Sequence, residues 1–274
     1  MVERLKFAIE KARAQRDADV ADGTVVAPAP RRAAAAPVDE LWASLEEIQL
    51  SPDQLERARI VTQDKSDLAH IPFDLLRTRL LKVFRDNGWS RIAITSPSKG
   101  CGKTLVTANL AFSLARQSDL RTLVVDMDLK APELAHTLGR KNAPPLAWML
   151  SGQTDIQSGL KRCGPNLAFG LNGERVRDST ELIQDEKTVS VLASLNESLK
   201  PDAVIYDLPP MLVSDDAIAF VQHVDCVLLV AASGQTTAKE IEHCERMFAG
   251  HVNFLGVLLN KAQDDVDRKA YEYS

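Results

Sequence analysis

RIAITSPSKGCGKT, at residues 91–104, is the stretch that decides the fold, because an apolar run leads directly into a glycine-containing turn. Residues 104–117 continue with the apolar repeat of a helix. Gly100 and Gly102 allow the backbone to curl so that successive N–H groups point into one concavity. The start of the helix adds the positive end of its dipole. This strand–loop–helix unit therefore predicts a phosphate-binding loop.

The loop also carries the side chains that a nucleotide site requires. Lys103 would reach the β- and γ-phosphates, and the Thr104 hydroxyl would hold Mg²⁺. The match to the pattern GxxxxGK[ST] is incomplete, because Pro97 stands at the first glycine, and a glycine-rich turn with an incidental lysine is the alternative. We expect ATP and Mg²⁺ as cofactors. The residues expected to contact the nucleotide are Lys99, Gly100, Cys101, Gly102, Lys103, Thr104 and Leu105.

Short apolar runs alternate with helical segments through the rest of the chain. Strands that are apolar on both faces and alternate with helices are typical of a parallel sheet covered on both sides. The sequence therefore predicts an α/β fold, a mostly parallel sheet with helices on both faces, like that of P-loop NTPases. Ligands of such sheets bind at the carboxyl ends of the strands. The expected strands are 91–95, 122–125, 167–169, 203–206, 227–230 and 254–259, and the expected helices are 53–60, 73–86, 104–117, 132–138, 181–199, 214–222 and 236–249.

Carboxylates follow two of these strands. Asp126 and Asp128 are spaced i, i+2 after the second strand, and Asp207 ends the fourth. Buried carboxylates need cations or hydrogen-bond partners, and beside a phosphate loop the cation would be the Mg²⁺ of the nucleotide. A helix-capping turn before Pro132 is the alternative for the first pair. We expect the three carboxylates and the loop to meet in one cleft.

Three segments are expected along the chain. Residues 1–40 combine a helix over 2–16 with an Ala/Pro-rich flexible linker, 41–263 form the P-loop domain, and 264–274 are a mobile tail that contains tyrosines. The helical N-terminal extension either docks on a membrane surface or partner, or packs weakly on its own protein.

Composition excludes several classes of protein. The 274 residues include 33 Lys and Arg against 38 Asp and Glu, and the net charge of −5 argues against nucleic-acid binding through bulk positive charge. The four cysteines are scattered without a CxxC pair, as in a reduced cytosolic protein. The longest apolar run, 226–232, is far shorter than the ~18 residues of a membrane span. We therefore expect a cytoplasmic protein that a partner recruits to the inner face of the cell membrane.

Three segments resemble the Walker A, Walker A′ and Walker B motifs of bacterial tyrosine kinases (BY-kinases) of the capsule and exopolysaccharide type: ITSPSKGCGKT, LVVDMDLKAPELAHTLG and VIYDLPPMLVSDD. The resemblance covers residues 65–263. It implies an ATP-dependent protein-tyrosine autokinase, a homo-oligomer that phosphorylates its own C-terminal tail in trans within a ring. It also implies a role in polysaccharide biosynthesis and export, with a separate membrane-embedded chain-length regulator as activator.

The resemblance assigns roles by position. Asp126 would accept the proton of the acceptor tyrosine, and the catalytic residues would be Asp126, Lys103 and Asp128. The metal ligands would be Thr104, Asp128 and Asp207, which face Mg²⁺ and its waters.

The sequence departs from the family pattern at several positions. Lys130 stands where the family has Arg, and lysine cannot form a bidentate fork. Lys99 stands where Pro is usual and adds a cation beside the phosphates. Cys101 replaces Glu, and it is either an exposed, oxidisable thiol or a small filler residue. Residues 74–80, DLLRTRL, replace the oligomerisation pattern ExxRxxR, which weakens the expectation of a ring.

The chain has three tyrosines. Tyr206 falls within a predicted buried strand, which excludes it as an acceptor unless the strand unfolds. Tyr271 and Tyr273 lie in the terminal segment DDVDRKAYEYS and are expected to be the phosphoacceptors. A solvated tail that happens to end in aromatic residues is the alternative.

Positioning or partitioning ATPases of the deviant-Walker type are the main alternative, since they share the fold and the aspartate after the second strand. They require a lysine five residues before Lys103, where this chain has Ser98.

Asn260 lies where related ATPases contact the adenine, or else it is a turn residue at a strand end. A nucleotide-binding regulator without kinase activity is a third hypothesis.

Overall fold

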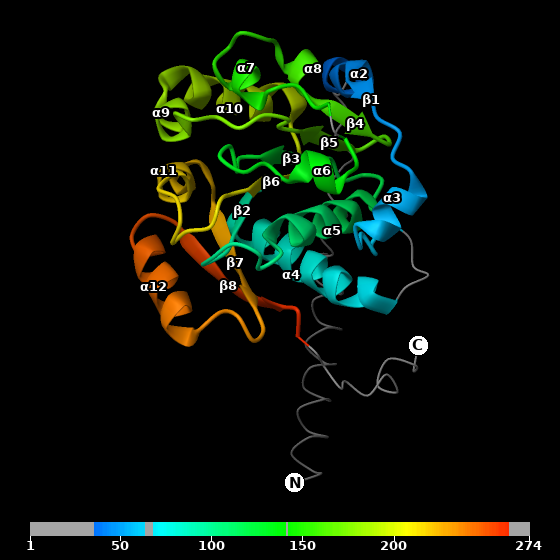
Figure 1. Cartoon of the computed structure of the whole chain (residues 1–274). Helices are drawn as coiled ribbons and strands as arrows, with labels where there is room; N and C mark the ends of the chain where they lie inside the picture. The colour runs from blue at the N-terminus through cyan, green and yellow to red at the C-terminus, as the bar shows by residue number, and fades with distance from the viewer. Residues whose placement is uncertain (1–35, 64–67, 141, 263–274) are drawn as a thin grey trace, which may run out of the picture. The chain divides into compact units, whose positions relative to one another are not determined.

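A computed structural model describes residues 36–63, 68–140 and 142–262, and those from Val38 onward belong to one compact unit (Figure 1). In this part of the chain, one sheet has the strand order β1-β4-β5-β3-β6-β2-β7-β8, and all neighbouring strands are parallel except β4 and β5. The strands are β1 (Glu46–Glu47), β2 (Arg91–Thr95), β3 (Thr122–Asp126), β4 (Lys161–Cys163), β5 (Leu167–Gly170), β6 (Ala203–Asp207), β7 (Cys226–Ala232) and β8 (Asn253–Asn260).

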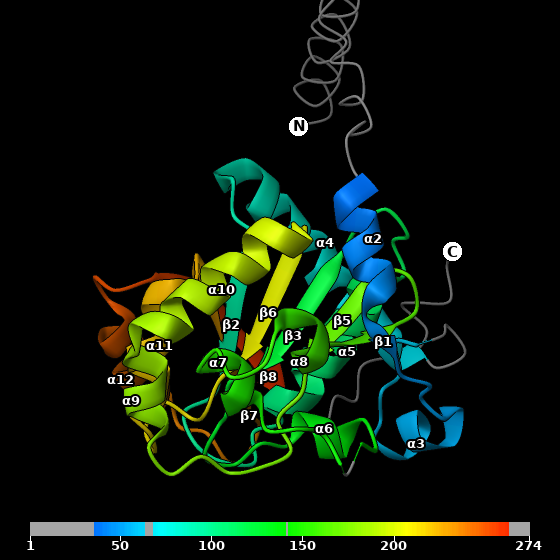
Figure 2. The ribbon, with the colours of Figure 1, turned by 90° about the horizontal axis from the view of Figure 1, so that it is seen from above.

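Helices cover both faces of the sheet (Figures 1 and 2). In β3, Val124 packs into the core beneath α3, α4, α5 and α6, whereas Leu123 and Val125 pack beneath α2, α7, α9, α10, α11 and α12. This alternation explains why the strands are apolar throughout. The helices are α2 (Ala36–Ser44), α3 (Pro52–Arg57), α4 (Ile71–Asn87), α5 (Lys103–Ala115), α6 (Leu134–Thr137), α7 (Leu146–Leu150), α8 (Ile156–Gly159), α9 (Ser179–Gln184), α10 (Glu186–Leu199), α11 (Asp216–Phe220) and α12 (Ala238–Phe248), with 3-10 turns η1 (Leu68–His70) and η2 (Val221–His223).

The predicted fold class is confirmed, and each of the six predicted strands is present. The prediction of one helix over 181–199 is wrong, because Asp185 interrupts it and its side chain accepts the N–H of Lys187 to start α10. Two strands were not predicted, since β1 and β4 are short and polar. Helix α2 begins at Ala36, inside the segment predicted as linker, and it buries Trp42. The predicted helix 2–16 and the tail 264–274 lie outside the described residues.

None of the helices in the described ranges combines the length and the apolar character needed to cross a membrane.

A buried amide fastens the end of α5 to the start of β3. The Asn166 Nδ2 group donates to the carbonyls of Ala115, Gln117 and Leu120 at 3.0, 2.7 and 2.9 Å. The Asn166 carbonyl accepts the N–H of Thr122 at 2.8 Å. The Asn166 side chain thus satisfies carbonyls at and after the end of α5 that lack helical partners. It thereby fixes α5, the helix that follows the phosphate loop.

We expect Asn166→Ala to lower the free energy of unfolding by about 1–3 kcal/mol, because buried carbonyls lose their donor. Urea denaturation measures this. Asn87→Ala is the matched control, since Asn87 donates to a carbonyl at the exposed end of α4, and it should change stability by under about 0.5 kcal/mol. Equal losses in both variants would contradict the assignment.

Candidate nucleotide-binding and catalytic site

The phosphate loop connects β2 to α5. Gly100 and Gly102 have φ angles of 78° and 90°, in the left-handed region where a side chain is strained. A Cβ atom at Gly102 would lie 2.3 Å from Asn260 Nδ2. Both the backbone and the available space therefore require glycine at this position. Helix α5 begins at the next residue, so its free N–H groups face the loop.

Lys103 lies where the ends of three strands meet. Its Nζ atom is 2.9 Å from Asp128 Oδ2, 3.4 Å from Asp207 Oδ1 and 3.2 Å from Thr104 Oγ1. The Thr104 hydroxyl donates to Asp207 Oδ2 at 2.7 Å. Asp126 is paired in register with Asp207 on the neighbouring strand. The structure therefore brings the loop and the three carboxylates together, as expected.

Burial dominates the electrostatics of this cluster. It raises the pKa of Asp207, and it raises the pKa of Asp126 well above its usual range, an effect that the neighbouring Asp207 reinforces. Burial alone would lower the pKa of Lys103, but the carboxylates of Asp207 and Asp128 outweigh it and raise that pKa. Lys103 therefore stays charged in a site that is rich in carboxylate oxygen.

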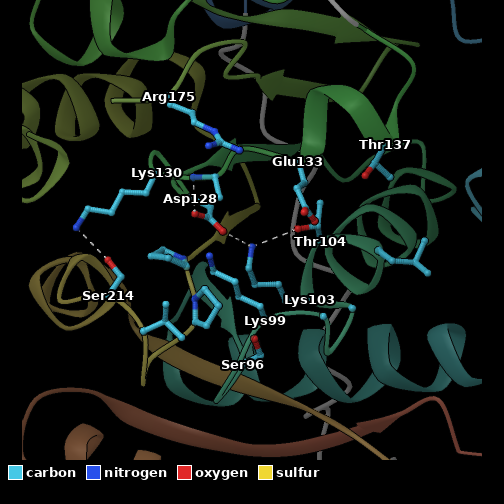
Figure 3. A pocket seen from close by; sticks show the side chains of 17 residues that line it. Ser96, Lys99, Lys103, Thr104, Asp128, Lys130, Glu133, Thr137, Arg175 and Ser214 are labelled. Atoms are coloured by element: carbon cyan, nitrogen blue, oxygen red, sulfur yellow. Dashed lines mark hydrogen bonds and ion pairs between the residues drawn. The ribbon is translucent and has the colours of Figure 1, made fainter. Parts of the chain in front are cut away.

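A cavity of about 440 Å³ adjoins the cluster (Figure 3). Most of the predicted nucleotide contacts line it, namely Lys99, Gly100, Gly102, Lys103, Thr104 and Leu105, together with Asp128. The other predicted site residues of the described chain do not line it, and these are Cys101, Asp126, Asp207 and Asn260.

Asp126, the predicted proton acceptor, is completely buried. Its two carboxylate oxygens accept the backbone N–H groups of Asp128 and Leu134, each at 3.2 Å. Asp128 is the neighbouring carboxylate that faces the cavity. Asp128 is thus the carboxylate that contacts the cavity, and Asp126 holds the backbone of Asp128 in place.

Asn260 and Cys101 stabilise the phosphate loop without lining the cavity. The Asn260 Nδ2 group donates to the Cys101 carbonyl at 2.9 Å. The Cys101 thiol is completely buried, with its Sγ atom 3.7 Å from Ser98 Oγ and 3.6 Å from Thr236 Oγ1. The interpretation of Cys101 as an exposed thiol is therefore wrong, and its burial agrees with the small-filler interpretation.

Lys130 bends away from Lys103 (Figure 3). Its Nζ atom lies 3.0 Å from Asp216 Oδ1 and 3.3 Å from Ser214 Oγ. The buried Asp216 carboxylate also accepts the hydroxyls of Ser179 and Thr180. Burial alone would raise the pKa of Asp216, but these hydrogen bonds and Lys130 hold that pKa below its usual value. Lys130 thus ties the loop after β3 to α11, and Asp216 extends the link to α9.

Other residues that line the cavity were not assigned from the sequence. Arg175 lies in the loop after β5. The rule that ligands bind at the carboxyl ends of strands predicts that this loop lies near the site, but no sequence motif identifies Arg175 itself. Pro209, Pro210, Val213 and Ser214 lie within a quoted motif without an assigned role. The complete set of unassigned lining residues is Ser96, Lys130, Ala131, Glu133, Thr137, Arg175, Pro209, Pro210, Val213 and Ser214.

The segment that replaces the oligomerisation pattern packs against α5. Asp74 accepts the Ser113 hydroxyl at 2.7 Å and pairs with Arg77 and Arg116. Arg77 also donates to the Ser113 carbonyl at 2.8 Å. Asp74 and Arg77 are therefore engaged within their own chain, and ring formation stays a prediction.

The residues present fit a magnesium–nucleotide complex. Within the described ranges, no group of three or more His, Cys, Asp or Glu side chains could hold a metal ion. Mg²⁺ beside a nucleotide needs only one or two protein carboxylates, because phosphates and waters supply the other ligands. Thr104 and Asp207, in contact beside a glycine loop, meet that requirement.

The fold and the site together define a P-loop nucleotide-binding protein, and residues 92–272 match the family described as the CobQ/CobB/MinD/ParA nucleotide binding domain. Tyrosine-protein kinase CpsD of Streptococcus pneumoniae serotype 4 is 30% identical over 181 residues, which are 65% of this chain and 78% of CpsD. The kinase domain of Escherichia coli tyrosine kinase ETK superposes with a TM-score of 0.66 at 29% identity, covering 73% of this chain and 79% of that domain. The chain belongs to the bacterial tyrosine kinases within this nucleotide-binding family.

Some relatives are much longer than this chain. Tyrosine-protein kinase ptk of Acinetobacter johnsonii is 28% identical over 206 residues, which are 74% of this chain but 28% of ptk.

We expect Gly102→Ala to weaken the binding of an ATP analogue about tenfold or more, roughly 1.4 kcal/mol, because the new methyl group displaces Asn260 and the loop. Titration with a fluorescent analogue measures this. Gly88→Ala is the control, since Gly88 also has a positive φ, of 69°, but a Cβ there meets no atom within 4 Å. Similar losses for both variants would show that general destabilisation of the fold, and not the phosphate loop, is responsible.

We expect Asp216→Asn to lower the free energy of unfolding at pH 7 by about 1–3 kcal/mol. Because the pKa of Asp216 is depressed in the folded state, its contribution is present above the unfolded pKa, about 3.9. That contribution is lost as the pH falls through the folded pKa. The difference between wild type and variant in urea unfolding should therefore shrink as the pH falls below about 3.9. Asp215→Asn, at the exposed neighbour, is the control, and a difference that does not depend on pH would contradict the prediction.

Proposed function

We propose that this chain is an ATP-dependent protein-tyrosine autokinase that regulates the biosynthesis and export of capsular or exopolysaccharide. One observation carries the proposal: Lys103, Thr104, Asp128 and Asp207, from three strand ends, form a single charged cluster beside a cavity. Phosphoryl transfer depends mainly on positioning and charge neutralisation, and this cluster supplies both. The names of the relatives support tyrosine as the acceptor.

Lys103 is the residue that we assign to the β- and γ-phosphates of ATP. It already has anionic partners in Asp128 and Asp207, so a phosphate oxygen would replace one of these rather than approach an unpaired buried cation. Thr104 and Asp207, with Asp128 beside them, would hold Mg²⁺, which neutralises phosphate charge when bound. Asn260 then acts by holding the loop through the Cys101 carbonyl.

Asp128 is the carboxylate that we assign to the acceptor hydroxyl, because it faces the cavity. A tyrosine with a pKa near ~10 needs a proton acceptor as its bond to phosphorus forms. Asp126 is completely buried and accepts the Asp128 N–H. We therefore assign Asp126 a positioning role in place of the predicted direct contact with tyrosine.

Tyr271 and Tyr273 are the proposed acceptors, presented by the tail of a second copy. Tyr206 is 1% exposed and its ring lies 4.8 Å from that of Phe220, so only unfolding would release it. The tail lies outside the described residues, and its role rests on the sequence.

The membrane context is also part of the proposal. The resemblance to the capsule and exopolysaccharide kinases supports a homo-oligomer at the cytoplasmic face of the membrane. The activator would be a separate membrane-embedded regulator of polysaccharide chain length, and nucleic acid is not an expected partner.

A positioning ATPase is the second candidate, because the matching family also includes MinD and ParA. Ser98 occupies the position of the additional lysine that this group requires. ATP hydrolysis without phosphotyrosine, stimulated by a membrane or partner, would favour this candidate.

Incubation of the purified chain with Mg-ATP should place phosphate on Tyr271 or Tyr273, as detected by intact mass and an anti-phosphotyrosine antibody. Lys103→Met should reduce the signal at least about 100-fold, because the phosphates lose their main cation. Lys82→Met is the control, since Lys82 is an exposed lysine on α4 that pairs with Asp86, and it should retain activity. Phosphotyrosine that persists in Lys103→Met would contradict the assignment.

A further inference from the structure

Four cations in the described part of the chain line the cavity, and they divide into two kinds. Lys103 and Lys130 are neutralised by the carboxylates of Asp128 and Asp216. Lys99 and Arg175 are exposed, and within the described ranges neither side-chain cation has an ion-pair or hydrogen-bond partner. These two side chains are therefore available to bind an anion in the cavity.

Arg175 projects from a loop that is firmly held. The Val176 N–H donates to the Leu129 carbonyl at 2.9 Å, which joins this loop to the one that carries Asp128. The buried Asn172 side chain accepts the Leu146 N–H at 3.2 Å. A Cβ at Gly173 would lie 1.9 Å from the Ala143 carbonyl oxygen. The backbone at Gly173 therefore packs directly against the backbone at Ala143. The loop thus offers a positively charged group at a fixed place, and Figure 3 shows that side chain reaching toward Asp128.

Strand order separates Arg175 from the phosphate loop. The loop follows β2, Asp128 follows β3 and Arg175 follows β5, and these strands stand in the order β5-β3-β6-β2. Since neighbouring strands are about 4.8 Å apart, β5 lies about 14 Å from β2. Lys99 and Lys103 thus approach a nucleotide from one side of the cavity, while Arg175 extends from the far side, beyond Asp128.

The wall that the segment after β6 forms, beside the phosphate loop, is apolar. Pro209, Pro210 and Val213 line the cavity, and Val213 is 54% exposed. Proline rings and a valine offer an apolar surface to an aromatic ring. The cavity therefore offers, in order from the phosphate loop toward β5, a surface suited to a tyrosine ring after β6, a carboxylate for its hydroxyl at Asp128 and a free guanidinium at Arg175.

We propose that Arg175 is a specificity-determining residue that binds the acidic side chain next to the acceptor tyrosine. The occupant is the tail of a second copy of this chain, in which Glu272 lies between Tyr271 and Tyr273. A guanidinium suits a carboxylate because it forms two parallel hydrogen bonds. This inference rests on the proposed function for the identity of the acceptor, and it adds that the acceptor is selected by a charge beside the tyrosine.

A charge-swap binding experiment tests the pair without requiring phosphoryl transfer. A fluorescein-labelled peptide of residues 263–274 is titrated with the full chain and a non-hydrolysable Mg-ATP analogue, and anisotropy reports the affinity. Arg175→Glu should weaken binding about 5-fold, in the range for reversing one exposed ion pair. The same peptide with Glu272→Lys should bind weakly to wild type and recover most of the loss on Arg175→Glu.

Arg177→Glu is the matched control, because Arg177 is exposed two residues away but does not line the cavity. It should change the affinity less than about twofold. Equal losses for both peptides on Arg175→Glu, or a loss confined to the affinity for the ATP analogue, would overturn the inference and assign Arg175 to the nucleotide.

The two proposals fail separately. A charge-swap recovery in a chain that never forms phosphotyrosine would reject the kinase while supporting the pairing of Arg175 with the tail. Phosphotyrosine formed with equal affinity and rate by wild type and Arg175→Glu would support the kinase and reject the role of Arg175.

Discussion

The rest of the site depends on the burial of Asp207 at the end of a central strand. A buried carboxylate is tolerated only with charged and hydrogen-bonding partners, and Asp207 finds them in Lys103 and Thr104. Those partners stand at the first turn of α5, so satisfying one carboxylate fixes the start of the helix and the loop that precedes it. The raised pKa of Asp207 shows that burial still opposes its charge.

The same cluster explains how a nucleotide site is preformed. Protein carboxylates hold Lys103 at the place where we propose that a phosphate binds, so binding would exchange a partner of Lys103 without moving its backbone. The left-handed glycines and the bond from Asn260 to the Cys101 carbonyl fix the loop backbone. Asp126 braces the adjacent loop through the N–H of Asp128. Preorganised charge of this kind is the main contribution that a protein makes to phosphoryl transfer.

Two cations at the periphery of the cavity have different surroundings. Lys130 is drawn to Asp216, whereas Arg175 from another loop extends toward Asp128. Lys130 thus ties the loop after β3 to α11, and Arg175 is left facing the cavity. Loops at strand ends can differ in this way because the sheet beneath them holds their ends in place.

Local pattern determined all but two of the described strands, the phosphate loop and the three carboxylates, because apolar runs and strand-end aspartates are read from neighbouring residues. It did not determine that Asp126 is sealed beneath Asp128, that Asn260 holds Cys101, or that Arg175 enters the cavity. It also missed β1 and β4, whose polar residues pair only because β5 provides a sheet edge. These features depend on distances between segments far apart in the sequence, and only the packed fold sets such distances.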